Sequence, residues 1–235
     1  MEKIPIIITN YNLVTWPKRM IEVLKTWDNV GEIIIFDNCS TYEPLLEWYQ
    51  SNPCEIIFSD YNRGHSGVWD RNIPWERNFT YYVVTDPDMG LDEVPKDALN
   101  VLIDKMEIHK EFDRIGLSIL DFADPTPNVP HFYRMQHFYH EFWDPTKRED
   151  GLLKGHIIDT TFGMYHINRN KSGSSCSLDF PYSVRHLPWQ ITNDQLMDLE
   201  NFNPEYFYYL THAGYSSSYK RESGFENLYN SKKLS

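Results

Sequence analysis

Continuous apolar runs alternate with helical segments through the first half of the chain, and this alternation constrains the fold more than any single motif. Residues 4–9 form such a run without the polar alternation of a half-buried strand, as expected for a strand covered on both faces. Further strands are predicted at 32–36, 55–58, 79–85 and 115–120, and helices at 17–27, 44–50 and 95–109. Because such alternation indicates βαβ units, we predict an α/β fold with a mostly parallel central sheet flanked by helices.

Four of the predicted strands end in polar residues. Asn10 follows the first strand, Asp37 the second, Asp60 the third, and Asp86 and Asp88 the fourth. In open sheets of this kind, ligands bind in the crevice beyond the carboxyl ends of the strands. The sequence therefore predicts one binding site where these side chains converge.

The triplet Asp86-Pro87-Asp88 is the strongest metal signal in the chain. It places two carboxylates at i and i+2 directly after a predicted strand, with a proline between them. Oxygen ligands of this kind suit a hard divalent cation that shares its coordination sphere with a phosphate. The triplet therefore points to Mn²⁺ or Mg²⁺ and to chemistry on a nucleotide diphosphate.

Composition narrows the class of protein. The 235 residues suffice for one α/β domain, and the net charge of −12 argues against a nucleic-acid partner, which requires a basic face. The three cysteines have no metal-site spacing and fit a reducing compartment. No apolar run approaches the roughly 20 residues of a membrane span. We expect a soluble cytoplasmic protein without an integral membrane segment.

The chain is predicted to form one domain over residues 1–235. Residues 1–121 would bind a nucleotide and residues 122–215 would bind the acceptor and hold the catalytic base. Within the second part we expect a long loop over the crevice at 124–150, a strand at 156–166 and a helix at 204–212. The polar segment 216–235 is predicted to be a loosely attached tail.

The strand-end motifs together resemble nucleotide-sugar-dependent glycosyltransferases of the GT-A fold, in particular the large family-2 type. The resemblance covers roughly residues 4–120 and rests on their order and spacing. The motifs are Ile7-Ile8-Thr9-Asn10-Tyr11-Asn12, Phe36-Asp37-Asn38-Cys39-Ser40-Thr41, Asn62-Arg63-Gly64 through Arg71-Asn72, and Asp86-Pro87-Asp88. This resemblance implies a Rossmann-like GT-A domain that binds a nucleotide-diphosphate sugar.

The resemblance also implies which residues hold the nucleoside of the donor. Thr9 and Tyr11 would line the base pocket beside Asn10, with the Tyr11 ring stacking on the base. Asp37 would hydrogen-bond the ribose or the base edge, and Asp60 would meet the base. The alternatives are a loop aromatic packed over the core for Tyr11 and turn-forming residues for the two aspartates.

The phosphates and the metal would be held by the remaining motifs. Gly64 would let the backbone approach the nucleotide, with simple turn chemistry as the alternative. Arg71 would pair with a phosphate or with Asp86, because a guanidinium matches either partner. By the resemblance, Asp88 meets the metal, while Asp86 contacts the ribose or the metal. A further metal ligand would be His186, with His212 as the alternative.

The second half lacks the acidic pair and the Gln-x-x-Arg-Trp motif typical of family 2. Inverting transfer requires a carboxylate that deprotonates the acceptor hydroxyl. Asp159 is the candidate base because it lies within an apolar run, where burial would raise its pKa. The alternatives are Asp121 or Asp124 as the base, and a purely structural role for Asp159.

The sequence thus predicts a metal-dependent glycosyltransferase. It would move a sugar from a nucleotide-diphosphate donor, with UDP favoured, to a hydroxyl of a glycan, lipid or protein, with inversion preferred. One alternative is a nucleotidyltransferase of similar topology, against which the glycine-free loop at 10–13 argues. The other is a non-catalytic nucleotide- or glycan-binding protein with this fold.

Overall fold

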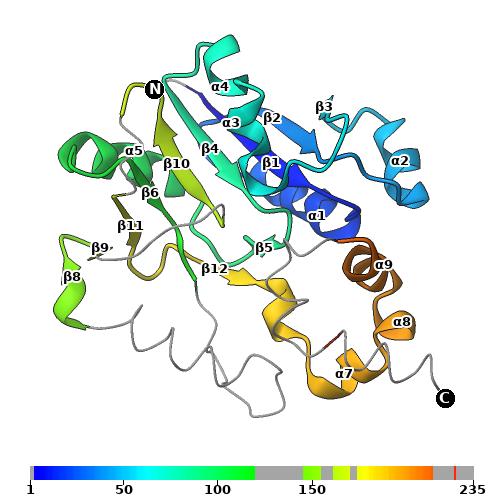
Figure 1. Cartoon of the computed structure of the whole chain (residues 1–235). Helices are drawn as coiled ribbons and strands as arrows, with labels where there is room; N and C mark the ends of the chain where they lie inside the picture. Colours follow the sequence, from blue (N-terminus) through cyan, green and yellow to red (C-terminus); the bar gives the residue numbers. More distant parts are fainter. Residues whose placement is uncertain (1–2, 120–144, 155–160, 170–173, 214–224, 226–235) are drawn as a thin grey trace.

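The computed structural model describes residues 3–119, 145–154, 161–169, 174–213 and Phe225. It confirms the α/β fold, with a nine-stranded central sheet in the order β3-β2-β1-β4-β10-β6-β11-β9-β8 (Figure 1). The strands are β1 (Ile4–Asn10), β2 (Val30–Asp37), β3 (Glu55–Phe58), β4 (Tyr81–Thr85), β6 (Arg114–Gly116), β8 (Arg148–Glu149), β9 (Leu152–Lys154), β10 (Gly163–His166) and β11 (Ser175–Leu178).

The sheet is mostly parallel, as predicted. The neighbouring strands β3, β2, β1 and β4 are parallel to one another, and β6 and β11 also form a parallel pair. β10 lies antiparallel between β4 and β6, and β9 is antiparallel to β11 and β8. Seven of the nine strands therefore point in one direction, and β10 and β9 point in the other.

Both faces of β1 are buried, which explains its unbroken apolar sequence. Ile4, Ile6 and Ile8 face a core that also contains residues of three helices, α1 (Thr15–Leu24), α2 (Glu43–Tyr49) and α5 (Ala98–Ile108). Ile7 points to the opposite face and packs in a second core with residues of α3 (Gly67–Asp70) and α4 (Ile73–Glu76). The alternation follows from the period of two residues along a strand.

The predicted strand at 115–120 is wrong in its continuity, because the chain leaves the central sheet inside it. The Leu117 N–H donates to the carbonyl of Phe162 at 3.0 Å, after β6 has ended. The next residues form β7 (Ser118–Ile119), which belongs to a small sheet of order β5-β12-β7. The other strands of this sheet are β5 (Met89–Gly90) and β12 (Ser183–His186).

The C-terminal part forms a helical unit against the carboxyl ends of the first strands. It consists of α7 (Asn193–Met197), α8 (Leu199–Phe202) and α9 (Pro204–His212), of which only the last was predicted. Figure 1 shows α9 below α1 and α2, at the end of the sheet toward which β1 runs. Among the described residues, no helix is long and apolar enough to cross a membrane.

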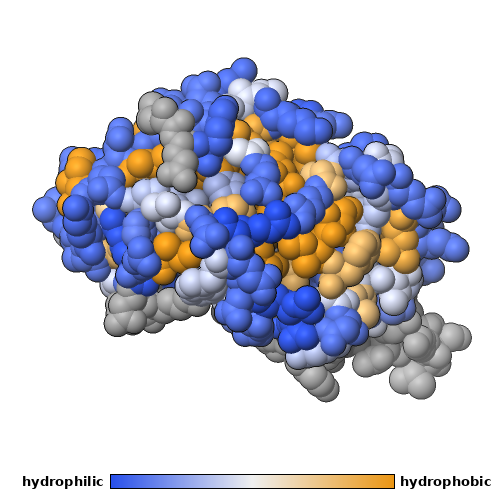
Figure 2. Space-filling model, turned by 90° about the horizontal axis from the view of Figure 1, so that it is seen from above, coloured by the Kyte–Doolittle hydropathy of each residue, from blue (hydrophilic) through white to orange (hydrophobic). Residues whose placement is uncertain are grey.

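Figure 2 looks onto the opposite end of the molecule, where the parallel strands begin. Hydrophobic side chains emerge there between hydrophilic ones.

The predicted loop at 124–150 and the tail at 216–235 lie largely outside the described residues. The predicted strand at 156–166 is described only from residue 161, and this part contains β10.

Gly67 is a steric requirement of the packing between α3 and the sheet. A Cβ atom there would lie 2.3 Å from Cε1 of the fully buried Phe36. We expect Gly67→Ala to lower the free energy of unfolding by about 1–3 kcal/mol through overpacking. Gly64→Ala separates overpacking from backbone strain, because its φ of +64° disfavours a side chain while nothing lies within 4 Å of the added methyl. Chemical denaturation of both variants measures the difference, and an unchanged stability for Gly67→Ala would contradict the packing account.

Candidate functional site

The small sheet brings His186 beside Asp88. β12 runs antiparallel to β5, with His186 opposite Met89, and the Leu187 N–H donates to the Asp88 carbonyl at 3.0 Å. As a result, Nε2 of His186 lies 3.9 Å from Oδ1 of Asp88. The two residues are almost 100 positions apart in sequence, so the β5–β12 pairing is what assembles this site.

Asp88 and His186 are buried polar groups with unused bonding capacity. Their side chains are only 14% and 13% exposed. Oδ1 of Asp88 and Nδ1 of His186 are buried and accept or donate no hydrogen bond within the described part of the chain. Buried polar atoms are nearly always satisfied, so this pair has the capacity to bind a further partner beyond the described residues.

Burial acts on the two groups in opposite directions. It raises the pKa of the Asp88 carboxyl and lowers the pKa of the His186 imidazole, because each charged form is desolvated. A carboxylate oxygen and a neutral imidazole nitrogen are both metal ligands. The donor set therefore fits a divalent cation, whose charge would stabilise the Asp88 carboxylate.

The protein supplies few ligands to this site. No group of three or more His, Cys, Asp or Glu side chains comes together as a metal site in the ranges that the structure describes. Asp86 precedes the pair and is half-buried. Ions such as Mg²⁺ commonly bind through one or two protein groups, with waters and substrate phosphates completing the shell. The arrangement is therefore suited to a cation that arrives with a phosphorylated ligand.

Asp37 lies inside the protein, where protein groups bond both of its carboxylate oxygens. It is fully buried, Oδ1 accepts from the Ser40 N–H at 2.8 Å, and Oδ2 accepts from the Tyr49 hydroxyl at 2.9 Å. Asn10 is also fully buried, and its Nδ2 donates to the Leu13 carbonyl and to the Tyr49 oxygen. This network orders the ends of β1 and β2, and neither side chain reaches the surface of the crevice.

Two further asparagines, which the sequence analysis did not assign, organise the same loops. Asn12 has φ 55°, and its Oδ1 accepts from the N–H groups of Thr41 and Tyr42 at 2.6 and 3.0 Å. Asn38 accepts from the Arg63 N–H and donates to the Gly64 carbonyl. Their positive φ or loop position is typical of asparagine and is the signal that could have identified them.

Tyr11 lies at the junction between the first strand end and α9. Its hydroxyl donates to the His212 carbonyl at 3.2 Å, and its ring meets Tyr209 edge-on at 6.2 Å between centroids. The side chain is half-buried, which leaves part of the ring open. Thr9 is buried, and its hydroxyl has no hydrogen-bond partner among the described residues.

His212 does not share the site of Asp88. Its Nδ1 is 2.9 Å from the Tyr208 carbonyl, and its ring stacks on Tyr208 at 3.8 Å between centroids. The Tyr208 hydroxyl lies 3.1 Å from the Thr41 hydroxyl. His212 thus belongs to the aromatic surface of α9, whereas His186 is the histidine that lies beside Asp88.

The third strand end presents an exposed carboxylate. Asp60 bonds Nη2 of Arg63 at 2.7 Å, and this pairing lowers the pKa of the Asp60 carboxyl. The Arg63 guanidinium also lies 4.0 Å above the ring of Tyr61. Arg71 is exposed and lies on the same side, where its charge also lowers the Asp60 pKa. Gly64 follows this group with φ +64°, a backbone conformation that favours glycine.

The predicted base Asp159 and its alternatives, Asp121 and Asp124, lie outside the described residues. These assignments stay predictions.

The chain was compared with known proteins. No protein-family model matches it, and no curated protein matches it significantly. Among solved structures it is similar to S. aureus TarS, with 11% identity over 91% of this chain and 46% of that one, and a TM-score of 0.48. It is also similar to glucosyl-3-phosphoglycerate synthase of Mycobacterium tuberculosis in complex with Mn²⁺, UDP-glucose and phosphoglyceric acid, with 9% identity over 70% and 56% of the chains and a TM-score of 0.45.

A third similar structure is CMP:2-keto-3-deoxy-manno-octonic acid synthetase complexed with CTP. Here the identity is 14% over 49% of this chain and 52% of that one, with a TM-score of 0.36. The chain spans about half the length of these three structures.

Proposed function

We propose that this protein is a metal-dependent glycosyltransferase that uses a nucleotide-diphosphate sugar. The observation that carries the proposal is the buried, unsatisfied pair of Asp88 and His186 beyond the carboxyl end of β4. This end of a parallel sheet is where ligands bind in open α/β folds. The resemblance of the strand-end motifs to GT-A enzymes supports a sugar nucleotide as the ligand, with UDP favoured.

In this proposal, Asp88 and His186 would hold Mn²⁺ or Mg²⁺ against the diphosphate. A divalent cation bound there would neutralise the charge that develops on the diphosphate as the bond to the sugar breaks. Asp86 is the neighbouring carboxylate and would bond the ribose or add a metal ligand. Arg71, the C-cap residue of α3, is an exposed cation near Asp60 and would pair with the phosphates.

The nucleoside would lie over the loops that follow β1 and β3. The open part of the Tyr11 ring would stack on the base, and the exposed carboxylate of Asp60 would accept hydrogen bonds from the base edge. Thr9 would offer its unpaired hydroxyl, and Gly64 would leave room for the backbone to approach. Asn10 and Asp37 lie beneath these loops and would hold them in position.

The acceptor would be a hydroxyl of a glycan, a lipid or a protein. Asp159 would remove its proton as the sugar transfers with inversion. This role rests on the sequence of residues 155–162.

Turnover measurements test the proposed function. The purified protein is incubated with UDP-, GDP-, CMP- and dTDP-sugars, with Mn²⁺ or with EDTA, and nucleotide release is quantified. We expect release from one class of sugar nucleotide with Mn²⁺ and none with EDTA. Release of pyrophosphate from a nucleoside triphosphate would identify a nucleotidyltransferase instead, and turnover of no donor would favour a binding protein.

His186 and His212 can be separated by mutation. We expect His186→Ala to raise the Mn²⁺ concentration needed for half-maximal turnover by at least about tenfold. Even the loss of a residue that only orients a metal ligand weakens metal binding by this factor. His212→Ala is the matched control, because its imidazole bonds the Tyr208 carbonyl. A Mn²⁺ titration of turnover measures both, and the reverse order of effects would assign the metal to His212.

A further inference from the structure

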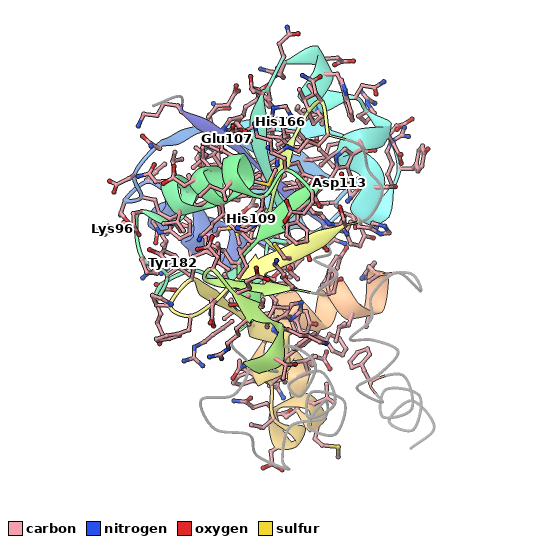
Figure 3. The ribbon with its side chains drawn as sticks, turned by 90° about the vertical axis from the view of Figure 1, so that its left-hand side faces the viewer. Lys96, Glu107, His109, Asp113, His166 and Tyr182 are labelled. Carbon is pink, nitrogen blue, oxygen red and sulfur yellow. The ribbon has the colours of Figure 1, made fainter. Side chains whose placement is uncertain are left out.

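A cavity on the α3 face of the sheet is separate from the Asp88 site. It has a volume of about 290 Å³ and is lined by residues of α3, β4, β6 and β10. Tyr82, on its wall, is the second residue of β4, whereas Asp88 comes after that strand has ended. In Figure 3, Asp113 and His166, two residues of its lining, lie between α5 and the cyan segment that carries α3 and α4.

Three aromatic rings form a fixed wall in this cavity. Tyr82 and Tyr165 stack at 5.5 Å between centroids, and Trp69 meets Tyr165 edge-on at 5.2 Å. The Trp69 indole N–H donates to the Tyr82 hydroxyl at 3.1 Å. Because these rings hold one another in place, the wall is preformed and loses little side-chain entropy when a ligand binds.

Arg114 supplies a cation to the same cavity. Its Nε is buried and has no hydrogen-bond partner among the described residues, and no carboxylate there pairs with its guanidinium. The guanidinium carbon lies 5.9 Å from the Tyr165 ring centroid. Arg169, the other arginine of the lining, already pairs with Glu107 at 3.6 Å and bonds the Phe112 carbonyl. Arg114 is therefore the group with capacity for an anion.

The size and the rim of the cavity narrow the ligand class. Pockets that bury drug-sized ligands span roughly 300–1,000 Å³, so about 290 Å³ suits a single ring. Ser66 and His166 add polar groups around the aromatic wall, and Asp113 adds a carboxylate that would accept hydrogen bonds from ligand hydroxyls. An aromatic platform with polar groups at its rim matches a pyranose, which has an apolar face and hydroxyls at its edge. A guanidinium matches a carboxylate in two-point geometry.

We propose that this cavity binds one pyranose unit that carries a carboxylate, a hexuronic-acid type of sugar. The ring lies against the half-buried Trp69, which Tyr82 and Tyr165, only 2% and 7% exposed, support from behind, and the carboxylate pairs with Arg114. This is a binding site without chemistry of its own, and it does not depend on the metal site.

Isothermal titration and saturation-transfer NMR with D-glucuronate test the proposal on the full chain. D-glucose has the ring without the charge, and benzoate has the charge without the hydroxyls. We expect saturable glucuronate binding at millimolar concentrations, with at least tenfold weaker binding of the other two. Equal binding of glucose or of benzoate would overturn the ligand class, and no binding of glucuronate would overturn the site.

Variants locate the binding. Arg114→Gln should weaken glucuronate binding by about 10- to 100-fold, the range for a charged hydrogen bond. Arg114→Lys keeps the charge and should bind more tightly than Arg114→Gln. Arg77→Gln is the matched control, because Arg77 is exposed and pairs with Glu55 and Glu32 away from the cavity. Asp88→Asn should bind glucuronate like the wild type. Wild-type binding by a folded Arg114→Gln variant would refute the assignment.

Discussion

Replacing Asp88 with asparagine is expected to lower metal-dependent donor turnover by about 100- to 1,000-fold, equivalent to several kcal/mol of transition-state stabilisation. Asparagine keeps the shape of the side chain but removes the charge that would bind the cation beside His186. Turnover at saturating donor, measured over a range of Mn²⁺ concentrations, gives the effect. Asp92→Asn is the control, since Asp92 is an exposed carboxylate that pairs with Arg19.

The same substitution should act in the opposite direction on stability without metal. Burial raises the pKa of Asp88 in the folded state, so the folded protein favours the neutral form. The stability that this provides is complete below the unfolded pKa, near 4, and is lost as the pH rises through the raised folded pKa. In EDTA at pH 8, Asp88→Asn should therefore melt above the wild type. Unchanged turnover, or a lower melting temperature in EDTA, would contradict the role of Asp88.

Replacing Glu205 with alanine is expected to destabilise the protein by about 2–4 kcal/mol. Glu205 lies in α9, yet its carboxylate accepts from the backbone N–H groups of Val14 and Thr15 at 2.8 and 3.0 Å. It also accepts from the Thr15 hydroxyl at 2.7 Å. Val14, the residue just before α1, has no side chain that can cap the helix. Glu205 therefore performs this role from 190 residues away.

Thermal unfolding measures this effect. For a chain of this size, about 2–4 kcal/mol corresponds to a melting temperature lower by roughly 4–16 °C. Glu205→Gln should lose less, because the amide keeps one acceptor. Glu200→Ala is the control, since Glu200 is exposed in α8. A Glu205→Ala protein with wild-type melting temperature would show that the contact contributes nothing.

The first half of the fold was accessible from sequence because its signals are local. The predicted strand at 55–58 matches β3, and the apolar run at 4–9 matches β1. The helix at 204–212 matches α9, which starts at a proline after the capping residue Asn203. In these segments the pattern of apolar residues and the end signals agree.

The candidate site was less accessible because its contacts are distant in sequence. The proximity of His186 to Asp88 depends on the pairing of β12 with β5, two short strands without a periodic signal. Asp37 differs in that its partners are close in sequence: its carboxylate is occupied by Ser40 and Tyr49. A strand-end aspartate has the same sequence pattern whether it binds a ligand or orders a loop, so only the three-dimensional contacts distinguish the two.

Diffraction from crystals soaked with Mn²⁺ and UDP tests the central claim most directly, because anomalous scattering locates the metal without reference to activity. We predict one strong anomalous peak within coordination distance of the Asp88 carboxylate and the His186 imidazole, with diphosphate oxygens completing the shell. A peak elsewhere in the crevice, or bound UDP without any peak beside Asp88, would contradict the account.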